Sequence, residues 1–190
     1  MTGGGPETYA LPARYTVAEY LANEELSPLK HEFIDGVVYA MSSASSAHNR
    51  LTGYLYSRID AGLTPPCEAF FVDMRLKIDV RAKTIFYYPD VLVNCSPDDT
   101  ASHHREKPVL LIEVLSPTTE RIDRTEKLEA YQRIPSLQEY ALVASEFPKL
   151  EILRRAGGWA VETYGLGDTV TFESVGVTVE LGKLYARIGF

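Results

Sequence analysis

The sequence contains very little cysteine, with only Cys67 and Cys95 among its 190 residues. Two cysteines are too few for the disulfide framework of a small secreted protein, and no Cys/His spacing typical of structural zinc is present. Cys95 ends an apolar stretch, where we expect it to behave as a small hydrophobic residue. This cysteine usage predicts a reducing, cytoplasmic setting.

Long hydrophobic runs are also missing, because no stretch approaches the roughly 18 apolar residues of a membrane span. The start of the chain, with Gly3, Gly4 and Gly5, lacks the basic and apolar regions of a secretion signal, so we expect residues 1–14 to be a flexible tail. No glycine-rich phosphate loop, Gly-x-Ser-x-Gly elbow or internal repeat occurs. These absences set aside membrane proteins, P-loop enzymes, α/β-hydrolases and repeat proteins.

Positive charge is scarce, since 19 Lys and Arg against 26 Asp and Glu give a formal net charge of −7. This net negative charge is unfavourable for binding a polyanion, because non-specific affinity for nucleic acid comes from Lys and Arg that displace counterions. Local basic groups could compensate, or could be ordinary solvated surface. They are His103 to Lys107, the group of Arg121, Arg124 and Lys127, and the pair Arg154 and Arg155.

The length and composition predict one compact domain, which we place at residues 15–190. Apolar periodicity and turn residues predict a mixed α/β sheet with hairpins added at both ends. The expected helices are residues 15–25, capped by Thr16 and Glu19, then 45–63 and 120–134. The expected strands are residues 68–81, 85–95, 109–114, 139–144, 150–154 and 159–164, with a hairpin at 31–41 around Asp35-Gly36 and an apolar strand near 175–181.

Two of these strands carry a single carboxylate in an otherwise apolar run, Asp90 in Tyr88 to Val93 and Glu113 in Val109 to Val114. Runs that are apolar at every position are typical of central strands covered on both faces. A buried ionised carboxylate is costly, so each acid should shift its pKa, pair with a cation or bind a metal. If both acids lie at one edge of the sheet, a divalent ion neutralises them together; otherwise each is simply solvated at a strand end.

The helix expected at 120–134 turns a lysine inward. Lys127, Ala130, Tyr131 and Ile134 follow the spacing of a core-facing stripe, with Asp123 one turn earlier. Thr118 or Thr119 should cap the first turn of this helix. An inward lysine needs a carboxylate or an anionic substrate, unless Asp123 and Lys127 form only a surface pair.

Two further polar residues share faces with core residues. Glu32 alternates with Ile34 in the hairpin, so it either points toward the core as an auxiliary metal or water ligand or is an exposed strand acid. His48 is in register with Leu51 and Leu55, so it faces inward near a helix N-terminus. The helix dipole there favours a neutral imidazole, which either hydrogen-bonds a water at a phosphate or anchors the hairpin loop.

The order of Pro-Asp, an apolar strand with Glu and a helical lysine resembles the PD-(D/E)XK nuclease superfamily. More closely, the chain resembles the Uma-two family of restriction endonucleases from about Tyr15 to Phe190. The usual superfamily lysine lies two residues after the second acid, a position occupied here by Leu115, and the resemblance implies that Lys127 has replaced it. The residues that carry the resemblance are Glu32 to Gly36, His48-Asn49, Tyr88 to Asp90, Ile112 to Thr119, Asp123, Lys127, Tyr131 and Pro135 to Tyr140.

The resemblance implies a restriction-endonuclease-like fold with an α-β-β-β-α-β core and a metal-dependent endonuclease acting on DNA. Mg²⁺, with Mn²⁺ as a substitute, would bind Asp90, Glu113 and the Val114 carbonyl, since Mg²⁺ takes oxygen ligands and keeps several waters. Lys127 would orient or deprotonate the attacking water, with Glu32, His48 and Asp123 as auxiliary residues.

Two other functions stay open at this point. The same fold could bind nucleic acid or a protein without cutting, as the net charge and Leu115 suggest, or it could hydrolyse a small phosphorylated molecule in a closed pocket. A nuclease with one site per chain often cuts both strands as a two-fold dimer, so we expect a homodimer.

Overall fold

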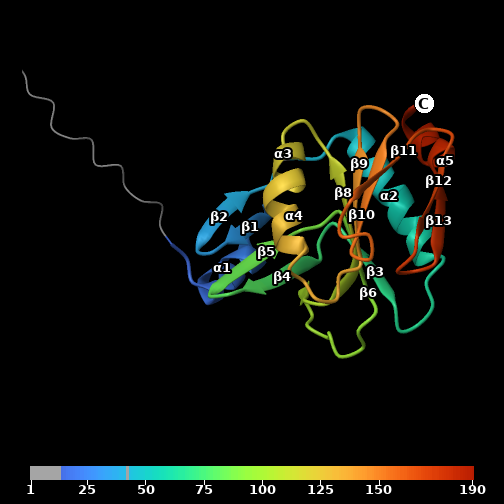
Figure 1. Ribbon diagram of the computed structural model, residues 1–190. Coiled ribbons are helices and arrows are strands. Elements are labelled where there is room, and N and C mark those ends of the chain that lie inside the picture. The colour runs from blue at the N-terminus through green and yellow to red at the C-terminus, as the bar shows by residue number, and fades with distance from the viewer. Residues whose placement is uncertain (1–13, 42) are drawn as a thin grey trace, which may run out of the picture.

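The computed structural model describes residues 14–41 and 43–190. Apart from Arg14, the expected tail therefore lies outside the described residues. A six-stranded mixed sheet forms the centre of the molecule (Figure 1), with strand order β11-β10-β9-β8-β6-β3. Its strands are β3 (Glu68–Phe71), β6 (Val91–Asn94), β8 (Pro108–Leu115), β9 (Glu139–Ala144), β10 (Leu150–Arg154) and β11 (Val161–Tyr164).

A second sheet of five strands, in the order β2-β1-β5-β4-β7, lies beside the first. Its strands are β1 (His31–Ile34), β2 (Val37–Ala40), β4 (Arg75–Val80), β5 (Lys83–Tyr87) and β7 (His104–Arg105). The expected hairpin at 31–41 is confirmed as β1 and β2, and the turn between them has positive φ at Asp35 (49°) and Gly36 (93°). The expected mixed α/β fold is confirmed.

Two long strands were expected at 68–81 and 85–95, but each is divided between the two sheets. The first breaks after β3 at Val72, where φ is 62°, and continues as β4. The second breaks between β5 and β6 at Tyr88 to Asp90, where Pro89 has no N–H to donate to a ladder. These two corners join the sheets and place Asp90 at the junction.

The helices pack on both faces of the central sheet. The helix α2 (Ser46–Asp60) covers one face, and α1 (Val17–Leu26) covers the outer face of the second sheet through Tyr20, Phe33 and Phe86. The helix α1 has the expected capping box between Thr16 and Glu19. A third helical segment, residues 120–131, lies between the two sheets.

The helix expected at 120–134 consists of three consecutive pieces. They are α3 (Glu120–Ile122), a π-helical turn at Asp123–Lys127, and α4 (Leu128–Tyr131). The expected cap by Thr118 or Thr119 is wrong, because no side chain caps α3; instead Ser116 Oγ accepts a hydrogen bond from the Thr119 N–H at 3.3 Å. The expected core-facing stripe is confirmed, because Lys127, Ala130, Tyr131 and Ile134 are all buried.

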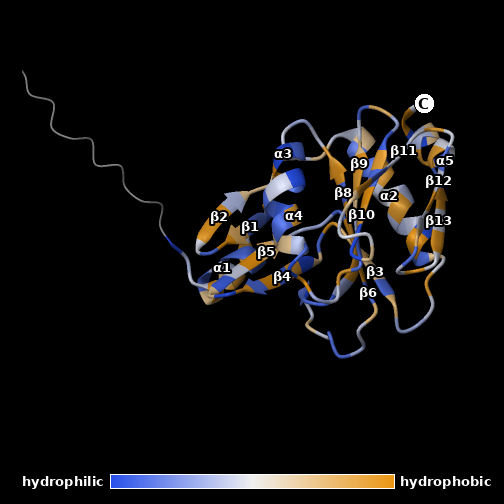
Figure 2. Ribbon diagram, viewed as in Figure 1, coloured by the Kyte–Doolittle hydropathy of each residue, from blue (hydrophilic) through white to orange (hydrophobic). Residues whose placement is uncertain are grey.

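The strand β8 is buried along nearly its whole length, as its continuous apolar run predicted. Leu110, Ile112 and Val114 pack on the α2 side, whereas Leu111 and Leu115 pack on the α4 side. Figure 2 shows the same concentration of hydrophobic residues in β8, β9 and β10. Side chains alternate across a strand, so Glu113 points to the α4 face.

The C-terminal region adds a small hairpin that the sequence analysis only partly anticipated. The strand β13 (Val177–Glu180) corresponds to the expected apolar strand, but its partner β12 (Thr169–Phe172) was missed. The chain then forms α5 (Leu181–Tyr185) and a 3₁₀ turn, Ala186–Ile188. Val170, Phe172, Val177 and Val179 complete the core on the α2 side.

The expectation that Cys95 behaves as a small hydrophobic residue is wrong, because Cys67 and Cys95 form a disulfide. The strands β3 and β6 are antiparallel with Glu68 opposite Asn94, which brings the flanking Cys67 and Cys95 together. The argument for a reducing compartment from cysteine usage therefore does not hold. Within the described ranges, no helix combines the length and hydrophobicity needed to cross a membrane.

Candidate active site

The two strand carboxylates meet where β6 begins and β8 approaches its end. The pairing of Val91 with Ile112 places the preceding Asp90 opposite Glu113. The Val114 N–H donates a hydrogen bond to Asp90 Oδ2 at 2.7 Å. The N–H and C=O groups of one strand residue point in the same direction, so the Val114 carbonyl also points toward the side of β8 on which Asp90 lies. The expected convergence of Asp90, Glu113 and Val114 is therefore present.

Lys127 reaches the same place from the π-helical turn. Its Nζ lies 3.1 Å from Glu113 Oε1, 3.1 Å from Asp123 Oδ1 and 3.2 Å from Glu32 Oε1. The Lys127 residue is only 6% exposed. The alternative of a surface pair between Asp123 and Lys127 is wrong, because both side chains are buried within this cluster.

Glu32 comes from the second sheet, so the site bridges the two sheets. It projects from β1 on the face turned toward α4, and its carboxylate contacts Lys127 rather than solvent alone. Tyr87 from β5 places its ring 5.4 Å from Lys127 Nζ. The lysine is thereby held between strands of both sheets, which fixes its position relative to Glu113.

The charges of this cluster do not balance. Burial by itself lowers the pKa of Lys127, but the Glu113, Glu32 and Asp123 carboxylates raise it well above its ordinary value. Burial raises the pKa of Glu113 well above its ordinary value; Lys127 opposes this shift, whereas Asp123 and Asp90 add to it. Three carboxylates share Lys127, and the fourth, Asp90, lies beside His48, so the cluster has more acids than cationic partners and a further cation would favour the ionised acids.

His48 occupies the first turns of α2 and faces the cluster. Its Nε2 lies 3.1 Å from Asp90 Oδ2. Burial lowers the pKa of His48, but the hydrogen bond and charge of Asp90 outweigh it and raise this pKa above its ordinary value. The expected preference for a neutral imidazole is thus wrong in direction, because it considered only the helix dipole.

The sequence analysis missed the tyrosine hydroxyls of the site. Tyr131 was assigned to the apolar stripe, yet its hydroxyl donates a 2.8 Å hydrogen bond to Glu113 Oε1. Tyr140 in β9 donates to the Asp123 carbonyl at 3.0 Å. The sequence spacing could have predicted the role of Tyr131. This residue lies one helical turn after Lys127 on the same face, so its hydroxyl can reach the carboxylate that Lys127 contacts.

The oxygen atoms of the cluster fit a hard divalent cation. Within the part of the chain that the structure describes, the hydrogen bonds and ion pairs of Asp90 and Glu113 involve Oδ2 and Oε1, which leaves Oδ1 and Oε2 as ligand atoms. No group of three His, Cys, Asp or Glu side chains in the described ranges could hold a metal ion. Proteins commonly hold Mg²⁺ with one or two carboxylates and several waters, so Asp90 and Glu113 are the side chains that would hold such an ion here.

The first expected basic group does not adjoin the site. Residues 103–107 precede the start of β8, whereas Glu113 lies near its other end. Arg105 is buried, donates to the Ala101 and His104 carbonyls and lies 4.4 Å over the Phe70 ring. Lys107 pairs with Asp98. This group therefore serves the structure of the loop before β8.

The other two basic groups are also occupied within the protein. Arg121 pairs with Glu126, and Arg124 pairs with Glu120 and Glu151. Arg154 pairs with Glu139 and Glu162, and Arg155 donates to the Leu137, Ile134 and Gln132 carbonyls. The expected compensation of the net negative charge by these groups is thus not observed.

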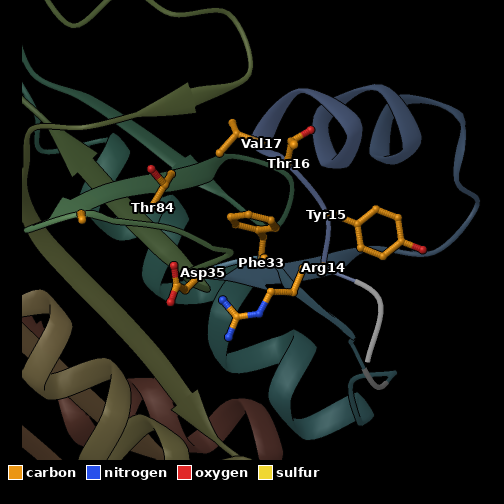
Figure 3. A pocket seen from close by; sticks show the side chains of 9 residues that line it. Arg14, Tyr15, Thr16, Val17, Phe33, Asp35 and Thr84 are labelled. Atoms are coloured by element: carbon orange, nitrogen blue, oxygen red, sulfur yellow. The ribbon is translucent and has the colours of Figure 1, made fainter. Parts of the chain in front are cut away.

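A cavity of about 260 Å³ lies away from the acid cluster. It is lined by Arg14, Asp35, Thr84 and Phe33, near the start of α1 (Figure 3). Phe33 packs toward α1, whereas the neighbouring Glu32 points to the opposite face of the sheet. None of the acid-cluster residues lines this cavity, so it gives no support to hydrolysis of a small molecule in a closed pocket.

Comparison with known proteins identifies relatives over most of the chain. One uncharacterized protein of Synechocystis sp. is 34% identical over 179 residues, which cover 90% of this chain and 92% of the relative. A second uncharacterized protein of the same organism is 35% identical over 146 residues, covering 75% and 81%. Neither name states an activity.

A solved structure supports the fold. A crystal structure from Anabaena variabilis, described as "a putative nuclease", has a TM-score of 0.72 and 17% sequence identity, and the match covers 92% of this chain and 99% of the other. At this identity the likeness concerns the fold, which is restriction-endonuclease-like. The Uma2 family model, described as "Putative restriction endonuclease", matches residues 17–181. The chain therefore belongs to the Uma2 family.

Proposed function

We propose that the protein is a metal-dependent endonuclease that hydrolyses phosphodiester bonds in DNA. The observation that carries this proposal is the burial of Lys127 against Glu113, with Asp90 opposite Glu113 on the next strand. A buried cluster with more carboxylates than cations destabilises the folded protein, so stability alone does not explain it. It is well suited to binding a divalent cation beside a lysine.

In this proposal Asp90, Glu113 and the Val114 carbonyl would hold Mg²⁺ or Mn²⁺. The ion would supply a more acidic bound water and neutralise charge on the phosphate. Lys127, held protonated by the surrounding carboxylates, donates hydrogen bonds to the attacking water and to the phosphate oxygens rather than removing a proton. Glu32 and Asp123 aim the ammonium group, and His48 orients Asp90.

The proposal is tested by cleavage of supercoiled plasmid and single-stranded DNA with Mg²⁺, Mn²⁺ or EDTA. The wild type should nick DNA only with metal, and Asp90→Ala and Lys127→Ala should abolish nicking. A matched control is Asp79→Ala, because Asp79 is an exposed strand acid paired with Lys77, outside the cluster. Absence of cleavage by the wild type under every metal would contradict the proposal.

A second candidate function is a binding domain of the same fold without catalysis. The specific observation in its favour is that the expected basic groups are neutralised by internal contacts, so long DNA gains little from them. DNA binding by both wild type and Asp90→Ala, without product from either, would support this function.

We also propose that the protein forms a two-fold homodimer, which would allow cleavage of both DNA strands. Light scattering at working concentration tests this proposal.

A further inference from the structure

The distribution of unpaired cations on the surface is uneven. Every lysine forms an ion pair with a described residue. Within residues 14–41 and 43–190, a small set of exposed arginines makes no such pair. They are Arg14, Arg50, Arg58, Arg81 and Arg187. Three of them, Arg50, Arg58 and Arg187, belong to α2 and to the C-terminal turn packed against it, and we name these three the arginine strip.

The arginine strip is organised by specific contacts. Arg50 Nη1 donates to the Arg187 carbonyl at 3.2 Å. The Arg187 guanidinium lies 4.9 Å over the ring of Tyr54. Arg50, Tyr54 and Arg58 are spaced by four residues, so they share one side of α2. Two of the three cations are thus fixed on one narrow surface.

No acid offsets these charges at the start of α2. The first turn of α2 contains no acidic residue, unlike α1, where Glu19 occupies the first turn. Asp60 is two residues beyond Arg58 and therefore lies on another side of the helix. The positive end of the helix dipole adds to the potential near the first turn of α2, whereas Arg58 lies in the last turn, where the dipole has the opposite sign. In a protein of net charge −7, such a concentration of unbalanced cations is stabilised by a bound polyanion.

The arginine strip and the acid cluster share the helix α2 but not one side of it. His48, whose Nε2 lies 3.1 Å from Asp90, precedes Arg50 by two residues, so the two side chains point to different sides of the helix. Figure 1 shows the C-terminus at the end of the molecule where α2 starts. From Arg50 to Arg58 the helix advances about 12 Å, over which one strand of B-DNA presents three or four phosphates.

We propose that the arginine strip binds the sugar-phosphate backbone of the nucleic-acid substrate at a distance from the bond to be cut, on another side of α2 from His48. This inference rests on the proposed nuclease function and names the surface that supplies its affinity. Guanidinium groups match phosphate oxygens with paired hydrogen bonds, and the Tyr54 ring keeps Arg187 in place while it does so. The three basic groups named in the sequence analysis form contacts within the protein. The arginine strip is therefore the surface that can bind the substrate.

The test is the salt dependence of binding to a fluorescent DNA duplex in EDTA, measured by anisotropy. The variant Arg50→Gln/Arg58→Gln/Arg187→Gln should reduce the slope of log affinity against log salt by about 0.9 per lost phosphate contact, roughly 2 to 3 in total. The matched control Arg14→Gln/Arg81→Gln removes two exposed arginines outside the strip and should change the slope by less than one. Thermal unfolding of each variant establishes that it folds.

Cleavage in Mg²⁺ separates this inference from the proposed function. The strip variant should raise KM at least tenfold and keep kcat, because the acid cluster is intact. If the wild type cuts DNA but the strip and control variants bind and cut alike, the strip proposal fails and the nuclease stands. If the wild type neither binds nor cuts DNA, both fail. Binding of the wild type to phosphatidylserine vesicles but not to DNA would also overturn the strip proposal.

Discussion

The Nζ of Lys127 lies 3.1 Å from Oε1 of Glu113, although the two residues come from a π-helical turn and a central strand. The lysine thus arrives at the carboxylate from the helix that follows the strand. Leu115, on the strand itself, packs in the core beside α4. The acid cluster therefore obtains its cation without a charged residue at position 115.

The substitution Lys127→Met tests how much the ion pair between Lys127 and Glu113 contributes to stability. Removal of the cation leaves the buried carboxylates of Glu113 and Asp123 and the half-buried one of Glu32 without their positive partner, and breaking a buried pair typically costs about 3–5 kcal/mol. We expect a loss of this size in the free energy of unfolding measured by urea denaturation in EDTA. Lys183→Met, which removes an exposed partner of Glu180, should change it by less than about 1 kcal/mol. Equal effects of the two substitutions would contradict the buried cluster.

The substitution Tyr131→Phe tests the hydroxyl that the sequence analysis missed. It removes the buried hydrogen bond to Glu113 Oε1 while keeping the ring. The expected loss of unfolding free energy is about 1.5–3 kcal/mol, the range for hydrogen bonds to charged groups. Tyr39→Phe is the control, because Tyr39 is 50% exposed. A loss no larger than that of the control would show that the Tyr131 hydroxyl does not stabilise the cluster.

The direction of Lys127 could be predicted from sequence because helical periodicity is local. Its spacing to Ala130 and Tyr131 was sufficient to turn the lysine toward the core, as the structure confirms. The apolar run around Glu113 likewise predicted a central strand. Local patterns therefore gave the elements that carry the pair Glu113 and Lys127.

The remaining features depend on contacts between distant segments. Glu32 enters the cluster only because β1 of the second sheet faces α4, and Arg124 is neutralised by Glu151 from β10. The division of the strand expected at 68–81 depends on a positive φ at Val72, a residue whose branched side chain disfavours that conformation. No local sequence pattern predicts these three features.

Metal binding can be measured without activity. Because the cluster has more carboxylates than cations, Mg²⁺ or Mn²⁺ should raise the Tm of the wild type, by an amount equivalent to about 2.7 kcal/mol at a concentration 100 times Kd. Asp90→Asn and Glu113→Gln should lose most of this shift, whereas the exposed-acid variant Asp79→Asn should keep it. A shift that persists in both cluster variants would place the metal elsewhere.

The stability of the metal-free protein should depend on pH through Glu113. Burial raises the pKa of Glu113 in the folded protein well above the value of about 4.3 that it has in an unfolded chain. Between these two values the folded state holds a proton that the unfolded state has released. The free energy of unfolding therefore falls as pH rises through this window.

The substitution Glu113→Gln removes this dependence, because a glutamine does not titrate. In EDTA, the stability of Glu113→Gln relative to the wild type should increase from pH 5 to pH 8, as measured by urea denaturation at each pH. Addition of Mg²⁺ should reverse the trend in the wild type alone, since a bound cation favours the ionised carboxylate. Parallel pH profiles for the two proteins in EDTA would mean that Glu113 is ionised in the folded state, so that Lys127 alone outweighs the burial of its carboxylate.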